Sequence, residues 1–440
     1  MKNLKYILCL MLLASCAAEQ KSAPVGSGTQ SEAAEEEQGP ATVSDSEREQ
    51  PLNEEVKKPM VVSGLNDLVS GHSAFAFDLH KVMPVQNLVY SPHSISTLLD
   101  ALQVGAAGET AEQMKQVLHI SHEKQDATHQ RTLFDALAAR EKGAGERGFR
   151  LRVSNNIWVD SGHSLKTSFL REVETNFLMT PKTLDFAASE DARKTINTSI
   201  SDATEQRIPD LIPPGVLNSL TRVVLTNAVY FNAPWRVPFP KSATADGPFT
   251  KLDGKNVTVP FMNLTETVGY TANKSYQAIE LPYAGGSVVA VVVLPEPGKY
   301  EEVDAALSAG RFTALAAGMS SERMQIQVPK FKIRTAIELN KTLMAMGMKD
   351  AFDQKKADFS GMVKEGGEPL YVSAILHEGF INVDEAGTEA AASTAVIMST
   401  RGMAEAPRAS FVANRPFTFL IVDKPTGEIL FVARVVNPAS

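Results

Sequence analysis

The chain has 440 residues, of which 43% are hydrophobic and 21% are charged, an ordinary globular composition long enough for one large domain or two medium ones. The formal net charge is −8. The sequence has no strongly basic balance of the kind that binds nucleic acid, so we expect no nucleic-acid partner. Both cysteines, Cys9 and Cys16, lie at the N-terminus, which excludes disulfides, thiolate metal sites and cysteine catalysis from the folded part.

The first 15 residues have the pattern of a secretory signal, in which two lysines precede an apolar stretch at 6–13 that is too short to span a bilayer. The Leu-Ala-Ser-Cys sequence at 13–16 resembles a bacterial lipobox, which would make Cys16 the lipidated N-terminus. An ordinary signal peptide is the alternative. Ala17 follows the cysteine, and this resembles the sorting pattern of an exported protein anchored to the outer membrane or cell surface; a secreted, extracellular protein is the alternative.

Residues 17–58 contain no aromatic residue and only four large aliphatic ones. Such a segment cannot bury enough apolar surface to offset its conformational entropy. We therefore expect a signal peptide at 1–15, a lipidated cysteine with a disordered acidic tether at 16–62, and a folded domain at 63–440. As a random coil, a tether of about 40 residues would reach roughly 30–40 Å.

The expected helices lie mostly in the first half of the folded domain. Apolar residues recur with the spacing of one helix face in Leu65–Leu79, and Pro92 is tolerated in the first turn of the next helix. A short buried strand at Leu88–Tyr90 separates the two. Residues 110–113, Thr-Ala-Glu-Gln, fit a capping box that would begin a third helix, and Thr132–Lys142 predicts a fourth.

Most of the expected strands come later, an order that indicates an α+β fold rather than alternating α/β. Asn155, Asn156 and Asn227 lie within apolar runs, and a buried asparagine must find hydrogen-bond partners. One more helix is predicted at Leu339–Met348. Strands are predicted at Leu151–Val159, Thr221–Phe231, Ile279–Tyr283, Ser287–Leu294, Ser321–Ile333, Phe417–Val422 and Ile429–Val435.

No catalytic or metal-binding constellation stands out in the sequence. The eight histidines include no His-Glu-x-x-His pair, and His119 and His122 are two ligands at most, which do not make a site. There is no Gly-x-Ser-x-Gly element of a serine hydrolase. The Gly-x-Gly-x-x-Gly match at 143–148 follows a predicted helix and precedes a strand, the reverse of the dinucleotide-binding order. We therefore expect neither an enzyme nor a cofactor or metal site.

The segment from His377 to Pro416 is the most informative in the chain. It begins as a strand, continues into a run of small residues at Gly387–Ala395, and then reaches a lone arginine, Arg401. Written as a strand, Thr388–Ser399 places all of its charge on one face, so the other face could be buried in a sheet without stranding a charge. The segment is therefore compatible with becoming a central strand; a flexible Ala/Ser linker is the alternative.

Motifs spread over about residues 65–440 carry a resemblance to one family. Glu385-x-Gly-Thr-Glu-Ala-Ala-Ala, followed by Phe411-x-Ala-Asn-Arg-Pro-Phe, resembles the hinge of the serpin reactive loop and the strand after it. Further serpin-like signatures stand in family order at Asn87–Ile95, Gly105–Met114, Asn227–Trp235, Glu280–Tyr283, Leu294–Pro295, Pro329–Phe331 and Gly347–Met348.

This resemblance implies the serpin fold, with N-terminal helices packed on a large central mixed sheet, smaller sheets, and an exposed reactive-centre loop. It also implies three groups of residues: a hinge of small residues that begins the loop, a hydrogen-bonded shutter beneath the sheet where strands part, and a breach at the root of the loop. The matching positions are Glu385, Gly387, Thr388, Glu389, Ala390, Ala391, Ala392 and Ser393 for the hinge, Ser91, Ser94, Asn227 and His377 for the shutter, and Trp235, Lys330 and Glu385 for the breach.

The family usually places the attacked residue 16 positions after the glutamate of the hinge. Counted from Glu385, this gives Arg401, with Gly402 donating the leaving amine. Arg401 is also the only basic residue of the loop before its proline, and arginine suits a protease with an acidic specificity pocket, as in trypsin. The segment from 402 to 410 is long for the family, which leaves Thr400 and Gly402 as neighbouring alternatives.

The implied function is irreversible suicide inhibition of a trypsin-like serine endopeptidase by a monomeric protein. A non-inhibitory serpin that acts as a chaperone or binding protein is the alternative, and bulky or charged residues on the inserting face of the hinge would indicate it. This hinge has none. The chain departs from the family at Gln206, where glycine is common, and at Ser199, where tryptophan is common, and both departures concern local packing.

Overall fold

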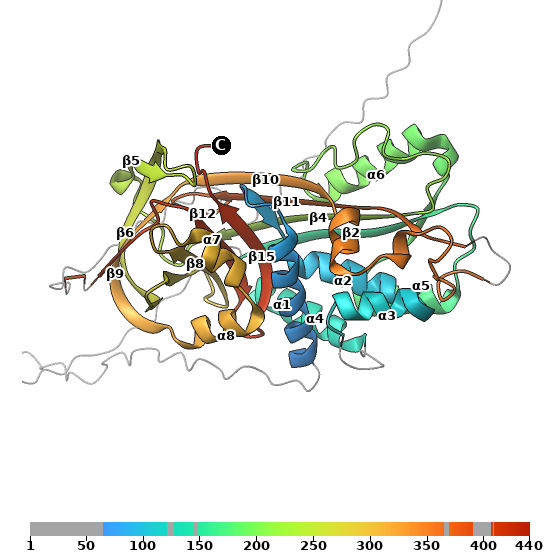
Figure 1. The fold of residues 1–440 in the computed structure, drawn as a ribbon, viewed down its shortest axis with the longest axis horizontal. Helices are drawn as coiled ribbons and strands as arrows, with labels where there is room; N and C mark the ends of the chain where they lie inside the picture. Colours follow the sequence, from blue (N-terminus) through green and yellow to red (C-terminus); the bar gives the residue numbers. More distant parts are fainter. Residues whose placement is uncertain (1–64, 121–126, 144–147, 365–368, 390–405, 408) are drawn as a thin grey trace, which may run out of the picture. The chain divides into compact units, whose positions relative to one another are not determined.

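The fold is α+β, as predicted: helices surround two β-sheets (Figure 1). The computed structural model describes residues 65–120, 127–143, 148–364, 369–389, 406–407 and 409–440. Within these ranges no helix is long and apolar enough to cross a membrane. The predicted signal peptide, Cys16 and the tether lie outside the described residues.

The predicted helices are present, and further ones lie between them. One of the predicted starts is wrong: α3 begins at Gly108 with Ala107 as its N-cap, so Thr110 lies inside the helix and is no capping residue. Its buried hydroxyl instead accepts a hydrogen bond from the backbone N–H of Asp358, at 3.0 Å. The helices are α1 Leu65–Val82, α2 Pro92–Gln103, α3 Gly108–Val117, α4 Thr128–Gly143, α5 Thr167–Phe177, α6 Ser189–Ala203, α7 Tyr300–Ala306, α8 Ala309–Ala317 and α9 Asn340–Met346.

The central sheet is mixed. Its strand order is β10-β11-β12-β4-β2-β3, in which the β11–β4 and β2–β3 pairs are parallel and the others antiparallel. Its members are β2 Arg150–Asp160, β3 Lys182–Leu184, β4 Val223–Pro234, β10 Phe331–Glu338, β11 Val372–Val383 and the two-residue β12 Gly387–Thr388.

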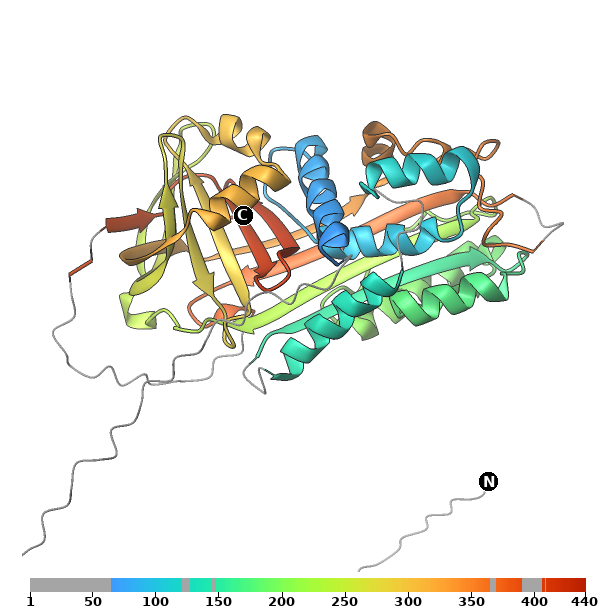
Figure 2. The same cartoon turned by 90° about the horizontal axis from the view of Figure 1, so that it is seen from below.

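Helices cover both faces of the central sheet, and buried side chains in the first half of β4 alternate between two cores on these faces (Figure 1). Val223 and Leu225 of β4 pack in the core that includes α2, whereas Val224 and Ala228 pack in the core that includes α6. Figure 2 shows the same arrangement turned by 90°, and α5 packs against both α2 and α4.

The remaining strands form a second sheet, in which β6 pairs with β5, β7 and β9. The single strand predicted at Ser321–Ile333 is wrong, because β9 and β10 lie in different sheets. Lys330 separates them and donates its backbone N–H to Pro260 at 2.9 Å. The members are β1 Leu88–Tyr90, β5 Ala245–Thr250, β6 Asn256–Ala272, β7 Tyr276–Pro282, β8 Val288–Pro295, β9 Ser320–Pro329, β13 Ala409–Val412, β14 Phe417–Asp423 and β15 Glu428–Val435.

The two departures from the serpin pattern lie at α6. Gln206, just after the helix, has a φ of 64°, a left-handed conformation that glycine adopts with the least strain. The left-handed backbone therefore explains why glycine is common at this position in the family. Ser199 lies within α6 and accepts a hydrogen bond from Lys182 at 3.3 Å.

Candidate functional site

The two central strands β4 and β11 meet at a junction that we call the seam. Val372–Phe380 of β11 pairs directly and in parallel with Val223–Tyr230 of β4. Beyond this stretch the strands separate, and β12 lies between them, antiparallel to both. Because β12 follows β11 after a short turn, the seam already holds the first residues of the segment that the sequence predicts can insert.

Thr388 is a fully buried residue of the hinge in the seam. It pairs with Ala233 of β4 and Val383 of β11. Its Oγ1 lies 2.6 Å from the hydroxyl oxygen of the equally buried Tyr283. The alternation predicted for this segment, with Thr388 on the face turned to the core, agrees with this placement.

Gly387 fits the seam because it has no side chain. A Cβ on this residue would lie 2.1 Å from the carbonyl oxygen of Ala233 and 2.7 Å from the Cα of Pro234. Its φ of +156° is also one that L-residues rarely adopt. The strand β4 therefore approaches the hinge too closely for any residue other than glycine.

Glu389 follows as the last described residue of the hinge, on the opposite face from Thr388. Its backbone N–H donates to Asn382 at 2.7 Å, and its carbonyl accepts from the side chain of Asn232 at 2.6 Å. Its carboxylate lies 3.2 Å from Arg207. Burial raises the pKa of Glu389, and the positive charge of Arg207 opposes this effect.

The three breach residues meet at the turn between β11 and β12. Lys330 Nζ lies 2.8 Å from one carboxylate oxygen of Glu385, and Thr244 donates to the other at 2.8 Å. Burial acts to raise the pKa of Glu385, but the hydrogen bonds from Lys330 and Thr244 outweigh it and lower that pKa. Trp235 stacks on Tyr283, with 4.5 Å between ring centroids, and its Nε1–H donates to the carbonyl of Asp384 at 2.9 Å.

The four predicted shutter residues also come together, where β4 and β11 still pair. His377 and Asn227 are direct partners in the parallel register, and the His377 ring hydrogen-bonds the Asn227 side chain. The backbone N–H of Ser91 donates to His377 Nε2 at 3.4 Å, so the proton of the neutral ring belongs on Nδ1, from which it is donated to Asn227. Asn227 in turn donates to Ser94 Oγ. Burial lowers the pKa of His377 to about 3, which keeps it neutral at pH 7.

Asn155 of β2 also belongs to the shutter network, although the family resemblance did not predict it there. Its Oδ1 accepts hydrogen bonds from Ser94 Oγ at 3.0 Å and from Asn227, and its Nδ2 donates to the Ser94 carbonyl at 3.2 Å. Its position inside an apolar strand was the available signal. Asn156, its neighbour, is half-buried and bonds Ser154 of its own strand at 3.1 Å.

The rest of the predicted site lies outside the described residues. This applies to hinge residues Ala390, Ala391, Ala392 and Ser393 and to the predicted reactive bond between Arg401 and Gly402. His122 also lies outside them. His119 follows α3, has a φ of 55° and lies 2.8 Å from Asp78, so it does not share a helix face with another histidine.

Comparisons with known proteins agree with this geometry. The family model "Serpin (serine protease inhibitor)" matches residues 70–438. A serpin-like protein of Thermococcus kodakarensis is 39% identical over 88% of each chain. Leukocyte elastase inhibitor A of Rattus norvegicus is 33% identical over 85% of this chain and 100% of its own.

Solved structures show the same architecture. Serpin48 of the insect Tenebrio molitor matches with a TM-score of 0.74 and 30% identity over 86% of this chain and 99% of its own. Human thyroxine-binding globulin matches with a TM-score of 0.75 and 27% identity over 86% of this chain and 100% of its own. In this chain, hinge residues Gly387 and Thr388 lie between the two central strands β4 and β11 of that architecture. The chain belongs to the serpin family.

Proposed function

We propose that this protein is a suicide inhibitor of a serine endopeptidase. The observation that carries the proposal is the seam, where Gly387 and Thr388 lie between β4 and β11 in antiparallel register with both strands. An inserting loop would continue the same register. Its backbone groups would gain strand partners and one face would be buried, so the inserted form would be the more stable one.

The register predicts how insertion would proceed. Thr388 pairs with Ala233, and each later residue would pair with one residue earlier on β4, so Thr394 would reach Asn227. The hinge would therefore enter before the shutter has to open. About 14 residues at roughly 3.3 Å each would carry the attached protease on the order of 45 Å.

The inserting face supports an inhibitor. In an inserted strand, Ala390, Ala392 and Thr394 would share the face that Thr388 turns to the core, and none of these four residues is bulky or charged. Insertion has to outrun hydrolysis of the acyl-enzyme, and small side chains lower the steric cost of entry. A carrier or chaperone would not need this property.

The proposed reactive bond is Arg401–Gly402, and the proposed target is a trypsin-like protease. The protease serine would attack the Arg401 carbonyl to form an acyl-enzyme, and Gly402 would leave as the free amine. The assignment rests on the distance in sequence from Glu385 and on the single basic side chain before the proline of the loop.

The test is incubation of the purified full chain with trypsin, followed by a denaturing gel. A covalent band at the summed mass that Arg401→Ala abolishes supports both the mechanism and the bond. Arg408→Ala is the matched control, since Arg408 lies in the same loop and should be dispensable. Cleavage after Arg401 without a complex would favour the non-inhibitory alternative, and a complex that survives Arg401→Ala would place the bond elsewhere.

We also propose that lipid on Cys16 anchors the exported protein to the outer membrane or cell surface. The lipobox-like sequence at 13–16 supports this proposal, and the acidic segment at 16–62 would then act as a tether. Cys16→Ser should abolish incorporation of labelled fatty acid and release the protein from membranes. Cys9→Ser is the control, and continued lipid labelling of Cys16→Ser would refute the anchor.

A further inference from the structure

A cluster of buried ionisable side chains lies apart from the seam, where α1, α2 and β15 meet. His72 of α1 and His93 of α2 both direct Nδ1 at the same oxygen of Glu428, the first residue of β15, over 2.9 and 2.8 Å. The three side chains are 4%, 2% and 0% exposed. Their ligand atoms all lie within 4.8 Å of one another.

The acid groups around the cluster are only partly satisfied by hydrogen bonds. Asp100 of α2 and Asp423 of β14 are also buried, and Asp423 stands directly opposite Glu428 in the strand pair. Among the described residues, each of these three carboxylates has one buried oxygen without a hydrogen-bond partner: Asp100 Oδ1, Asp423 Oδ1 and Glu428 Oε2.

Arg140 lies 2.6 Å from Asp423, and the imidazoles of His72 and His93 face Glu428. Like charges opposite each other in a sheet are destabilising, and a buried carboxylate oxygen without a partner is costly. The three unsatisfied oxygens, together with the facing positions of Asp423 and Glu428, favour a cation at this place.

We propose that His72 Nδ1, His93 Nδ1 and the Glu428 carboxylate bind a divalent transition-metal ion of the zinc type. Two imidazoles and one carboxylate are a ligand set that zinc takes, with a fourth position left for water. In a tetrahedral site two ligand atoms lie about 3.3 Å apart. The two N–O pairs, now at 2.9 and 2.8 Å, would therefore separate by about half an ångström, and the two Nδ1 atoms, now within 4.8 Å of each other, would move closer together. The ion would replace the two Nδ1 protons, which would leave to solvent.

Asp100 supplies the outer support that such a site needs. Its Oδ2 lies 3.0 Å from His72 Nε2, the ring nitrogen that does not face Glu428. A carboxylate on the distal nitrogen fixes the orientation and tautomer of a ligating histidine. In the proposed site, Asp100 would thus be a positioning residue for His72.

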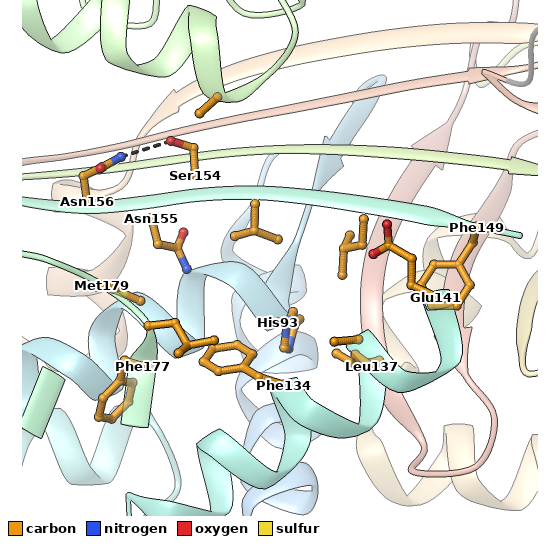
Figure 3. Close-up of a pocket in the computed structure, with 15 residues that line it drawn as sticks. His93, Phe134, Leu137, Glu141, Phe149, Ser154, Asn155, Asn156, Phe177 and Met179 are labelled. Carbon is orange, nitrogen blue, oxygen red and sulfur yellow. Dashed lines mark hydrogen bonds between the residues drawn. The ribbon is translucent and has the colours of Figure 1, made fainter. Parts of the chain in front are cut away.

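A pocket on the side of α4 reaches one residue of the cluster. His93 borders a pocket of about 380 Å³ that is also lined by Phe134 and Leu137 of α4, as Figure 3 shows. The ring of Phe134 meets the His93 ring edge-on, with 6.2 Å between centroids. An ion and its remaining water ligand could approach His93 through this pocket.

The test is titration of the metal-stripped full chain with Co²⁺ at neutral pH. We expect one equivalent of Co²⁺ to give the strong visible absorption of a tetrahedral nitrogen–oxygen site and Zn²⁺ to displace it. His93→Gln should abolish the absorption, and Asp100→Asn should weaken binding about 10–100-fold. His119→Gln is the control, because this exposed histidine also pairs with a carboxylate, Asp78, but lies outside the cluster.

Three results would overturn the proposal: no tetrahedral absorption from the full chain, unchanged absorption in His93→Gln, or a thiolate charge-transfer band that places the ion on Cys9 or Cys16. X-ray absorption of the zinc-loaded full chain needs no variant and covers the case in which His93→Gln fails to fold. Two imidazole ligands are expected there, and one or none would refute the site.

Discussion

Thr388→Arg tests the insertion mechanism at the point where the structure places the hinge. The threonine is fully buried, and its neighbours are the hydroxyl of Tyr283 and the backbones of Ala233 and Val383, none of which carries negative charge. An arginine at this position could not be buried without losing its hydration. We expect the variant hinge to leave the seam in the intact protein and to resist entry after cleavage.

The size of the effect follows from the desolvation of the guanidinium. An unpaired buried charge costs several kcal/mol even after relaxation, and about 3 kcal/mol in the barrier would slow insertion by roughly 100-fold. If the parent inserts about ten times faster than its acyl-enzyme is hydrolysed, it consumes about 1.1 molecules for each protease. By the same rate relation, the variant would consume about 11.

The assay is titration of a fixed amount of trypsin, which gives the number of inhibitor molecules consumed for each protease inactivated. A denaturing gel should show less covalent complex and more cleaved chain for Thr388→Arg. Thr388→Ser is the matched control, since it keeps a small side chain and a hydroxyl for Tyr283. An unchanged stoichiometry in Thr388→Arg would mean that a charge at this position does not slow insertion, and the reasoning would fail.

Three further predictions concern the same region. Burial lowers the pKa of His377 to about 3, so below pH 6.5, the ordinary pKa of histidine, the unfolded chain binds a proton that the folded chain does not. The free energy of unfolding, measured in urea, should therefore fall by about 2 kcal/mol between pH 7 and pH 5. An equal fall in His377→Gln would contradict this. Gly387→Ala should displace the hinge, since its Cβ would meet the Ala233 carbonyl at 2.1 Å, and should speed limited proteolysis there; unchanged proteolysis would argue against it. Glu385→Gln should cost less than about 1 kcal/mol, because Lys330 is 37% exposed, and the double variant with Lys330→Met should be less than additive; a much larger loss would show that the pair stabilises the fold.

Much of the fold was predictable because its strongest signals are periodic. The apolar strands at 151–159, 221–231, 417–422 and 429–435 are all present within one to three residues of their predicted ends. The run from Ser321 to Ile333 was wrongly predicted as one strand, because strand propensity carries no information about which sheet a strand joins. The change of sheet at Lys330 depends on a partner, Pro260, that lies far away in the sequence.

The start of α3 was missed for a related reason. A capping box is a local pattern, but the hydroxyl of Thr110 is used in a tertiary hydrogen bond to Asp358. The helices α5 and α6 were not predicted either, although both bury one face, through Phe169 and Val173 in α5 and Ile196 and Ile200 in α6.

The candidate site, too, was only partly predictable from the sequence. Family resemblance predicted which residues occupy the breach and shutter, and the structure brings each set together. It did not predict Tyr283 as the partner of Thr388, Thr244 as the second donor to Glu385, or Asn155 in the shutter. These contacts join elements far apart in the sequence, and no local pattern encodes them.

In the proposed insertion, different parts of the site would act at different stages. The hinge needs no opening to begin, since β12 already separates β4 from β11 at Gly387 and Thr388. The next obstacle is the direct pairing of the two strands, at whose centre His377 hydrogen-bonds Asn227. Neutral His377 donates one hydrogen bond across the seam and accepts another from Ser91, so it closes the sheet without burying a charge. A loop that has inserted as far as Thr394 would pair with Asn227 in place of His377. We expect the main barrier to insertion at this exchange of partners.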